Sequence, residues 1–288
     1  MTAELPEDVA RLAARAEAHA TPCGAGAMVW RVWRVAGTGA GALPPLVLLH
    51  GGSGSWMHWV RNIDTLLSWG RTVCVPDLPG FGDSAVPATG SDADALVAPL
   101  AEGMQALWGG APCDLVGFSF GGLAAGLLLA AEPALARQLV LVGAPAMGVV
   151  PQRQFTLKAW RHLPTEAQAA VHRHNLAELM LHDAALIEGL ALQVHCANVV
   201  RDRMPRRRLA HTDALARALP AVRCPVQAIY GERDALYKGF LPALESAYRT
   251  AAADFRGLSL VPDAGHWVQF EQPAPFADAL AAALAAGA

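Results

Sequence analysis

Residues 114–131 read DLVGFSFGGLAAGLLLAA, and this stretch predicts a strand, a sharp turn and a helix in direct succession. The run DLVG is typical of a buried strand, and the apolar run from 122 onward is typical of a buried helix. Between them stands the pattern G-x-S-x-G, whose glycines leave room for the strand to turn straight into the helix. Such a turn lifts the hydroxyl of Ser119 above the sheet, and the helix N-terminus behind it favours developing negative charge. The stretch therefore predicts a nucleophile elbow with Ser119 at its tip.

Short strand-like runs repeat on both sides of this elbow. The expected strands cover residues 28–35, 46–49, 72–75, 114–117, 139–142, 226–230 and 258–261. Helical stretches such as 93–108 and 122–131 separate most of them, and the Ala-rich tail from Ala274 predicts a closing helix. Strands that alternate with helices predict an α/β fold with a doubly wound, mostly parallel sheet.

Two segments break this rhythm. Residues 4–19 carry apolar side chains at helical spacing, which predicts an amphipathic helix on the outside of the domain. Residues 147–222 contain no convincing strand and are far too long for an ordinary crossover. They predict a helical lid over the C-terminal edge of the sheet, where ligands bind in such folds. The expected organisation is a helical N-terminal extension, a core in two pieces and a lid, over residues 1–24, 25–146 with 223–288, and 147–222.

A serine nucleophile needs a base and an acid, which follow it in the order acid, then histidine, in this kind of fold. Asp234 follows the expected strand VQAIY in the run GERD, and His266 follows LSLV in the run PDAGHW. Both positions fall at strand ends on the same edge of the sheet as Ser119. Asp263 and Glu232 lie nearby, but Asp234 is the favoured acid. The sequence predicts a triad of Ser119, His266 and Asp234.

The run HGGSGSW, residues 50–56, directly follows the expected strand LVLL. A tetrahedral intermediate needs two backbone N–H donors at its oxyanion. One is expected from Phe120, just after the nucleophile, and the second from Gly52, where glycine permits close approach of the backbone. His50 is expected to brace this loop without taking part in proton transfer.

Together the runs HGGSGSW, DLPGFGDS, GFSFGG, GERD and DAGHW resemble the α/β-hydrolase superfamily over nearly all of the chain except its N-terminal helix. The resemblance implies that DLPGFGDS, residues 77–84, is a structural loop and that residues 147–222 are the family's lid. Serine at the elbow excludes haloalkane dehalogenases and epoxide hydrolases, which place an aspartate there. It also excludes dienelactone hydrolases, which use a cysteine.

Within the superfamily, HGGSGSW followed by Arg61-Asn62, and GHWVQFEQP over 265–273, are similar to the meta-cleavage product hydrolases, which cut a C–C bond in ring-fission dienones. That group has Asn before the nucleophile, where this chain has Phe118. It also uses a lid arginine to hold the acidic end of the dienone, where this chain has His195. Losing two polar contacts favours hydrolysis of a small, apolar carboxylic ester. C–C bond hydrolysis stays open as an alternative, as do acyl transfer and a binding protein that keeps the triad.

Several aromatic and histidine side chains flank the expected site. Those expected to contact an apolar substrate, with ordinary core packing as the alternative, are Trp56, Phe118, Trp160, His195 and Trp267. The basic run RDRMPRRR, residues 201–208, is expected to be a solvated turn of the lid. His172 and His174 are likewise expected to be solvated, because no third ligand stands at a spacing that suits a metal.

Composition limits the remaining classes. Lys and Arg number 22 and Asp and Glu 25, a net charge of -3, which gives no general attraction to nucleic acid or anionic lipid. Apolar residues make up 53% of the chain, which excludes disorder throughout. Five widely spaced cysteines form no C-x-x-C pair, as expected for reduced thiols in a cytoplasm.

The sequence also limits partners and cofactors. It has no secretory signal, no stretch long enough to span a membrane and no G-x-G-x-x-G or P-loop. We expect a cytoplasmic enzyme that acts on a small molecule without a cofactor or metal and binds neither nucleic acid nor membrane. A homodimer is left open.

Overall fold

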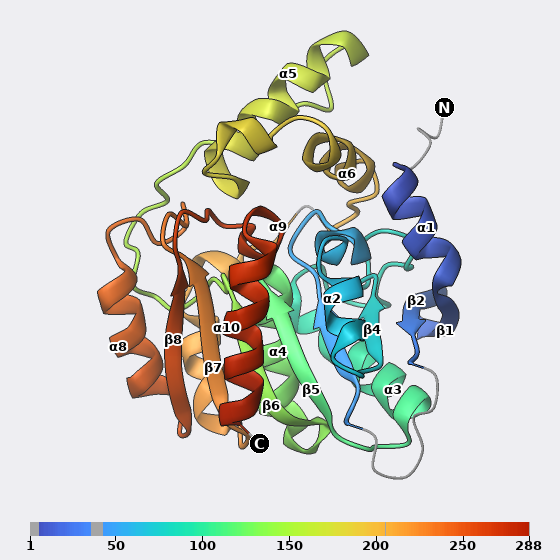
Figure 1. Ribbon diagram of the computed structural model, residues 1–288, viewed down its shortest axis with the longest axis vertical. Helices are drawn as coiled ribbons and strands as arrows, with labels where there is room; N and C mark the ends of the chain where they lie inside the picture. The colour runs from blue at the N-terminus through green and yellow to red at the C-terminus, as the bar shows by residue number, and fades with distance from the viewer. Residues whose placement is uncertain (1–5, 36–42, 205, 288) are drawn as a thin grey trace.

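A mixed, mostly parallel sheet of eight strands forms the centre of the molecule (Figure 1). The computed structural model describes residues 6–35, 43–204 and 206–287. The strand order is β1-β2-β4-β3-β5-β6-β7-β8, with β1 and β2 antiparallel to their neighbours and the rest parallel. The strands span Glu17–Cys23 (β1), Gly26–Trp33 (β2), Leu46–Leu49 (β3), Val73–Pro76 (β4), Cys113–Phe118 (β5), Ala136–Val142 (β6), Val226–Gly231 (β7) and Phe255–Val261 (β8).

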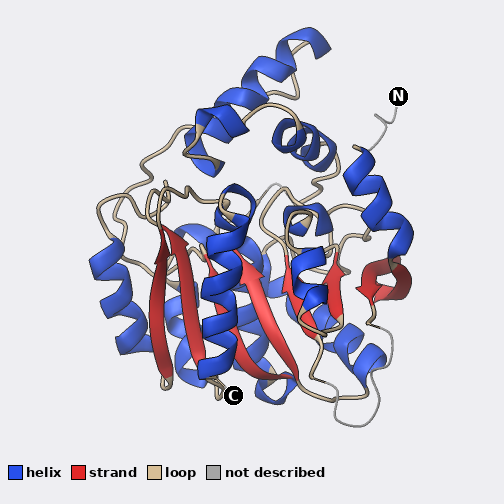
Figure 2. Ribbon diagram, in the orientation of Figure 1, coloured by secondary structure: helices blue, strands red, loops and turns tan. Residues whose placement is uncertain are grey.

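Helices cover both faces of this sheet (Figure 2). One apolar core includes side chains of α3, Val97–Trp108, of α4, Phe120–Ala131, and of α8, Leu241–Ala251. The core on the other face includes side chains of α2, Ile63–Ser68, and of α10, Pro273–Ala286. Because both faces are packed, the central strands are mostly apolar, and β3 and β4 are buried at every position. The expected doubly wound α/β fold is confirmed.

The N-terminal segment differs from the expectation of one helix over residues 4–19. Helix α1 spans only Glu7–Arg15, and β1 follows it directly as an edge strand; residues 1–5 lie outside the described part of the chain. Hairpin pairing with β2 determines the conformation here, through a tight turn in which Gly24 takes a φ of +55°. An edge strand is half exposed and tolerates proline, so β1 carries no apolar run that would reveal it in the sequence.

Between β6 and β7 the described residues form helices and no strand. The principal ones are α5, Thr165–Asn175, α6, Leu190–Val199, and the short α7, Ala214–Ala218. A π-helical turn, Leu176–Met180, continues α5. Figure 1 shows α5 and α6 above the edge of the sheet at which the parallel strands end. This lid therefore covers the edge that carries Ser119.

Within the described ranges, no helix has both the length and the apolar character needed to cross a bilayer. All five cysteines are free thiols, and four of them are buried.

Candidate active site

The turn from β5 to α4 holds Ser119 in a strained backbone conformation, with φ 51° and ψ -120°. Such a conformation persists only where the surroundings leave no alternative, and here the neighbouring glycines permit it. A Cβ on Gly117 would lie 2.6 Å from the carbonyl oxygen of Gly121, and one on Gly121 would lie 2.5 Å from that of His50. The strand can therefore run straight into the helix, with the serine at the tip of the elbow.

Asp234, His266 and Ser119 form a continuous hydrogen-bonded line. Nδ1 of His266 lies 2.9 Å and 3.1 Å from the two carboxylate oxygens of Asp234, and its Nε2 lies 2.9 Å from Oγ of Ser119. Asp234 and His266 are buried, whereas Ser119 is partly accessible. A carboxylate beside Nδ1 holds the proton there, which leaves Nε2 free to accept the proton of the serine.

Two backbone amides beside Ser119 are available to an oxyanion. Phe120 is the first residue of α4, so its N–H has no acceptor within the helix. Gly52 lies next to it, because a Cβ on Gly52 would stand 3.5 Å from Cβ of Phe120. Neither amide donates to an acceptor among the described residues. Both N–H groups can therefore bind the charge that develops when Ser119 attacks a carbonyl.

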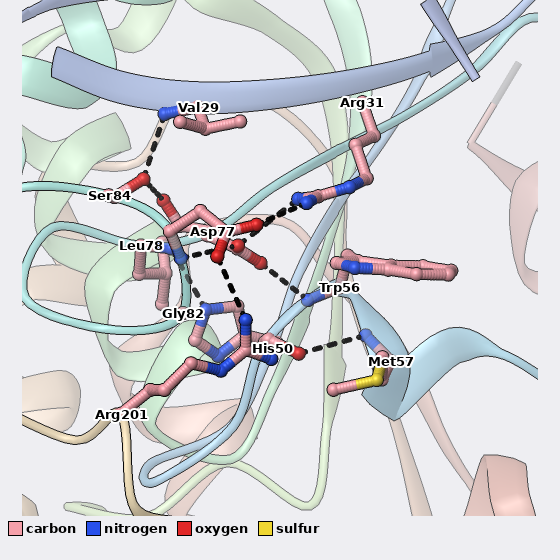
Figure 3. A network of polar contacts seen from close by, with 12 residues as sticks. Val29, Arg31, His50, Trp56, Met57, Asp77, Leu78, Gly82, Ser84 and Arg201 are labelled. Carbon is pink, nitrogen blue, oxygen red and sulfur yellow. Dashed lines mark hydrogen bonds and ion pairs between the residues drawn. The ribbon is translucent and has the colours of Figure 1, made fainter. Parts of the chain in front are cut away.

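Buried polar groups hold the loop that carries Gly52 (Figure 3). Nδ1 of His50 lies 2.8 Å from the carbonyl of Gly51, and its Nε2 accepts the N–H of Leu78 at 2.8 Å. The buried carboxylate of Asp77 accepts the N–H of Trp56 at 2.8 Å and pairs with Arg31 at 3.1 Å. His50 and the loop over residues 77–84 thus brace the loop that carries Gly52. His50 does not contact Ser119 within this network.

Burial of His50 makes the free energy of unfolding depend on pH. Burial lowers its pKa to about 4, against the opposing effect of Asp77, so the folded protein holds the ring neutral. The imidazole takes up a proton near pH 6.5 in the unfolded chain. The contribution of neutral His50 to the free energy of unfolding is therefore fully present above pH 6.5 and is lost as the pH falls toward 4. The loss expected from this group is about 3 kcal/mol.

The check is urea denaturation at pH 7 and at pH 4.5 for the wild type and His50→Gln. Glutamine can still accept the N–H of Leu78 but takes up no proton, so the variant is expected to lose less stability on acidification. Equal losses in both proteins would contradict the role of His50.

A cavity of about 540 Å³ opens above Ser119. Its wall includes three of the side chains expected to contact substrate, namely Phe118, Trp160 and His195. The other two lie elsewhere. Trp56 is buried against Trp33 and Arg31. Trp267 is buried against Phe270, and its Nε1–H donates to the carbonyl of His58 at 3.0 Å. Both tryptophans are therefore core residues behind the loop that carries Gly52. Core packing is the alternative given for them in the sequence analysis.

The basic run 201–208 is only in part the solvated turn that the sequence predicts, because Arg206 and Arg208 are exposed but other arginines of the run make specific contacts. Arg201 pairs with Asp83 at 2.9 Å, and the N–H of Arg203 donates to the carbonyl of Gly80 at 2.9 Å. Arg207 pairs with Asp202 at 2.7 Å and lines the cavity. Asp83 and Gly80 belong to the core, so Arg201 and Arg203 fasten the lid to it. Asp202 belongs to the lid, and Arg207 reaches the core through a donor contact of 2.9 Å to Oγ of Ser53.

Two further histidines are buried at or behind the cavity wall, and neither position follows from the sequence analysis. His58 lines the cavity and accepts the N–H of Gly51 at 3.2 Å, and burial lowers its pKa well below the usual value. His172 is buried rather than solvated, and its ring packs on Trp160 and His195. The signal for His58 is its position in the apolar run WMHWV soon after the glycine loop. For His172 the surrounding sequence offers no such signal.

Known proteins resemble this chain over most of its length. Residues 46–279 match a family described as the alpha/beta hydrolase family. The 2-hydroxymuconate semialdehyde hydrolase of Pseudomonas sp. (strain CF600) is 29% identical over 255 residues, covering 83% of this chain and 86% of that protein. The 2-hydroxy-6-oxo-6-phenylhexa-2,4-dienoate hydrolase of Burkholderia cepacia is 26% identical over 250 residues, covering 82% and 86%.

Solved structures share the fold at lower identity. The carboxylesterase CesB of Bacillus subtilis superposes with a TM-score of 0.73 at 19% identity, covering 98% of this chain and 96% of that one. A thermophilic esterase of Thermogutta terrifontis gives a TM-score of 0.71 at 22% identity, covering 95% and 99%. The family match spans most of the chain, from β3 into α10. The chain therefore belongs to the α/β hydrolase family.

Proposed function

We propose that this protein is a serine hydrolase that cleaves carboxylic esters of small molecules through an acyl-enzyme. Oγ of Ser119 attacks the carbonyl carbon while Nε2 of His266 takes its proton. The N–H groups of Gly52 and Phe120 stabilise the oxyanion, each contributing roughly 3 kcal/mol in the transition state. Asp234 keeps the imidazole in the productive tautomer and stabilises the imidazolium.

The second half of the reaction uses the same residues. The tetrahedral intermediate collapses, and the alcohol leaves with the proton from His266. Water then attacks the acyl-enzyme while His266 accepts a proton from it, and the carboxylic acid departs as Ser119 regains its hydrogen. The observation that carries this proposal is the 2.9 Å contact between Ser119 and His266 at the base of a cavity of about 540 Å³.

Hydrolysis of a C–C bond is a second candidate, because the two relatives above are named as hydrolases of 2-hydroxymuconate semialdehyde and of 2-hydroxy-6-oxo-6-phenylhexa-2,4-dienoate, and the sequence resembles the meta-cleavage product hydrolases. Two departures from the pattern of the meta-cleavage product hydrolases, as the sequence resemblance gives it, argue against this candidate. Phe118 stands where those enzymes have a polar asparagine. His195 stands where they have a lid arginine, and burial lowers the pKa of His195 to about 3, so the ring is neutral at physiological pH. At this one position the chain therefore supplies no positive charge in place of the arginine.

The two candidates differ in their best substrate. We expect kcat/KM for p-nitrophenyl butyrate to exceed kcat/KM for a ring-fission dienone. Consumption of the dienone is measured by the loss of its visible absorbance. Faster consumption of the dienone would move the assignment to C–C bond hydrolysis. Turnover of neither substrate beyond a single event would favour a binding role.

A further inference from the structure

The cavity above Ser119 has a wall with an uneven distribution of charge. Its lining includes three basic side chains, Arg153, Lys158 and Arg207, and no Asp or Glu side chain among the described residues. The chain as a whole has more acidic than basic residues, so composition does not explain this excess. Arg207 is matched by Asp202 at 2.7 Å, which leaves Arg153 and Lys158 as the unmatched charges.

Lys158 is held in place at the outer part of the cavity. The side chain of buried Asn175 accepts the N–H of Lys158 at 2.8 Å and donates to its carbonyl at 3.0 Å, which fixes this residue to α5. Arg153 lies over the ring of Phe155, with the guanidinium carbon 4.2 Å from the ring centre. Neither cation has an ion-pair partner among the described residues, and both are exposed, whereas the triad lies at the buried base.

The positive charge of Arg153 acts on a neighbouring histidine. The pKa of His211, which also lines the cavity, is lowered first by burial and then by the positive charge of Arg153, with a smaller effect of Arg207. Asp92 acts in the opposite direction without reversing the shift. The positive charge of Arg153 therefore disfavours a second positive charge at His211, and the same charge would attract an anionic group of a ligand.

We propose that the substrate carries a carboxylate, which Lys158 and Arg153 bind at the mouth of the cavity while Ser119 attacks an ester carbonyl at its base. This inference rests on the proposed ester hydrolysis and replaces the uncharged substrate suggested by the sequence. A charged wall in a partly enclosed site concentrates oppositely charged ligands and strengthens their binding.

The test compares two pairs of esters that differ only in charge. In one pair the charge lies on the acyl side, as the mono-4-nitrophenyl ester of adipic acid against its terminal amide. In the other pair it lies on the leaving group, as 4-acetoxybenzoate against 4-acetoxybenzamide. Each kcat/KM is divided by the rate of hydroxide attack on the same ester, which removes differences in intrinsic reactivity. We expect a preference of about 10-fold for the carboxylate in at least one pair.

The variants Lys158→Gln and Arg153→Gln are each expected to lower this preference about threefold, and the double variant about 10-fold. Asn175→Ala, which frees the backbone of Lys158, is expected to lower it as well. The matched control is Lys238→Gln, which removes an exposed lysine outside the cavity lining. High salt should reduce the preference of the wild type, because both cations are exposed.

The outcomes separate this inference from the proposed function. If the esters that carry an uncharged amide group are hydrolysed as well as those that carry a carboxylate, the inference is overturned and ester hydrolysis still stands. A preference that survives in the double variant would also overturn it. Turnover of none of the four esters would overturn the inference together with the proposed function.

Discussion

Replacing Ser119 with alanine is expected to reduce kcat for p-nitrophenyl butyrate by about 10⁵-fold, because no other group on the elbow can form the acyl-enzyme. The two free amides and the cavity remain in the variant, so KM should change little. Residual hydrolysis above the rate in buffer would come from these groups. Initial rates over a range of substrate concentrations separate the effect on kcat from the effect on KM.

The control for this variant is Ser246→Ala, which removes an exposed hydroxyl on α8, away from the cavity. This protein should retain wild-type rates. Thermal unfolding of both variants must show that each is folded. A folded Ser119→Ala protein with activity near that of the wild type would contradict the assignment of the nucleophile.

Asp234→Asn is expected to lower kcat by about 10⁴-fold while substrate binding is retained. Asparagine can donate to Nδ1 of His266, which moves the ring proton to Nε2. The nitrogen 2.9 Å from Ser119 would then hold a proton and could not accept another. The expected loss is therefore a loss of the base, with the position of the ring unchanged.

Asp263→Asn is the matched control, since Asp263 is a nearby exposed carboxylate that was considered for the same role. It should leave kcat unchanged. If Asp263→Asn were the more damaging substitution, the acid of the triad would have been assigned to the wrong residue.

The sequence predicts most of the fold because the central strands are short and buried on both faces. Such strands are mostly apolar, and Leu46–Leu49 is apolar at every position. They end at glycine or polar residues that mark the loops. β1 was missed because Glu17–Cys23 is an edge strand whose conformation depends on pairing with β2. Pairing partners are distant interactions that a local pattern does not reveal.

The juxtaposition of Ser119, Asp234 and His266 could be predicted for a related reason. In a parallel sheet, residues that follow successive strands meet at one edge, so positions in the chain report positions in space. No such rule relates the lid to the core. Arg207 and Lys158 enter the cavity because of how the lid packs, and their sequence surroundings resemble ordinary solvated turns. Trp56 and Trp267 show the converse, since residues next to the site in the chain turn their side chains into the core.

The acyl-enzyme on Ser119 is the central claim, and mass analysis of enzyme quenched during turnover tests it most directly. The wild type is mixed with p-nitrophenyl butyrate, quenched in acid and digested, and the peptide that contains Ser119 is analysed. We expect this peptide to carry a butyryl group at Ser119, with more of it in Asp234→Asn if deacylation is the step that is slowed further. Active enzyme with a butyryl group on another residue, or with none on any residue in either protein, would contradict the account.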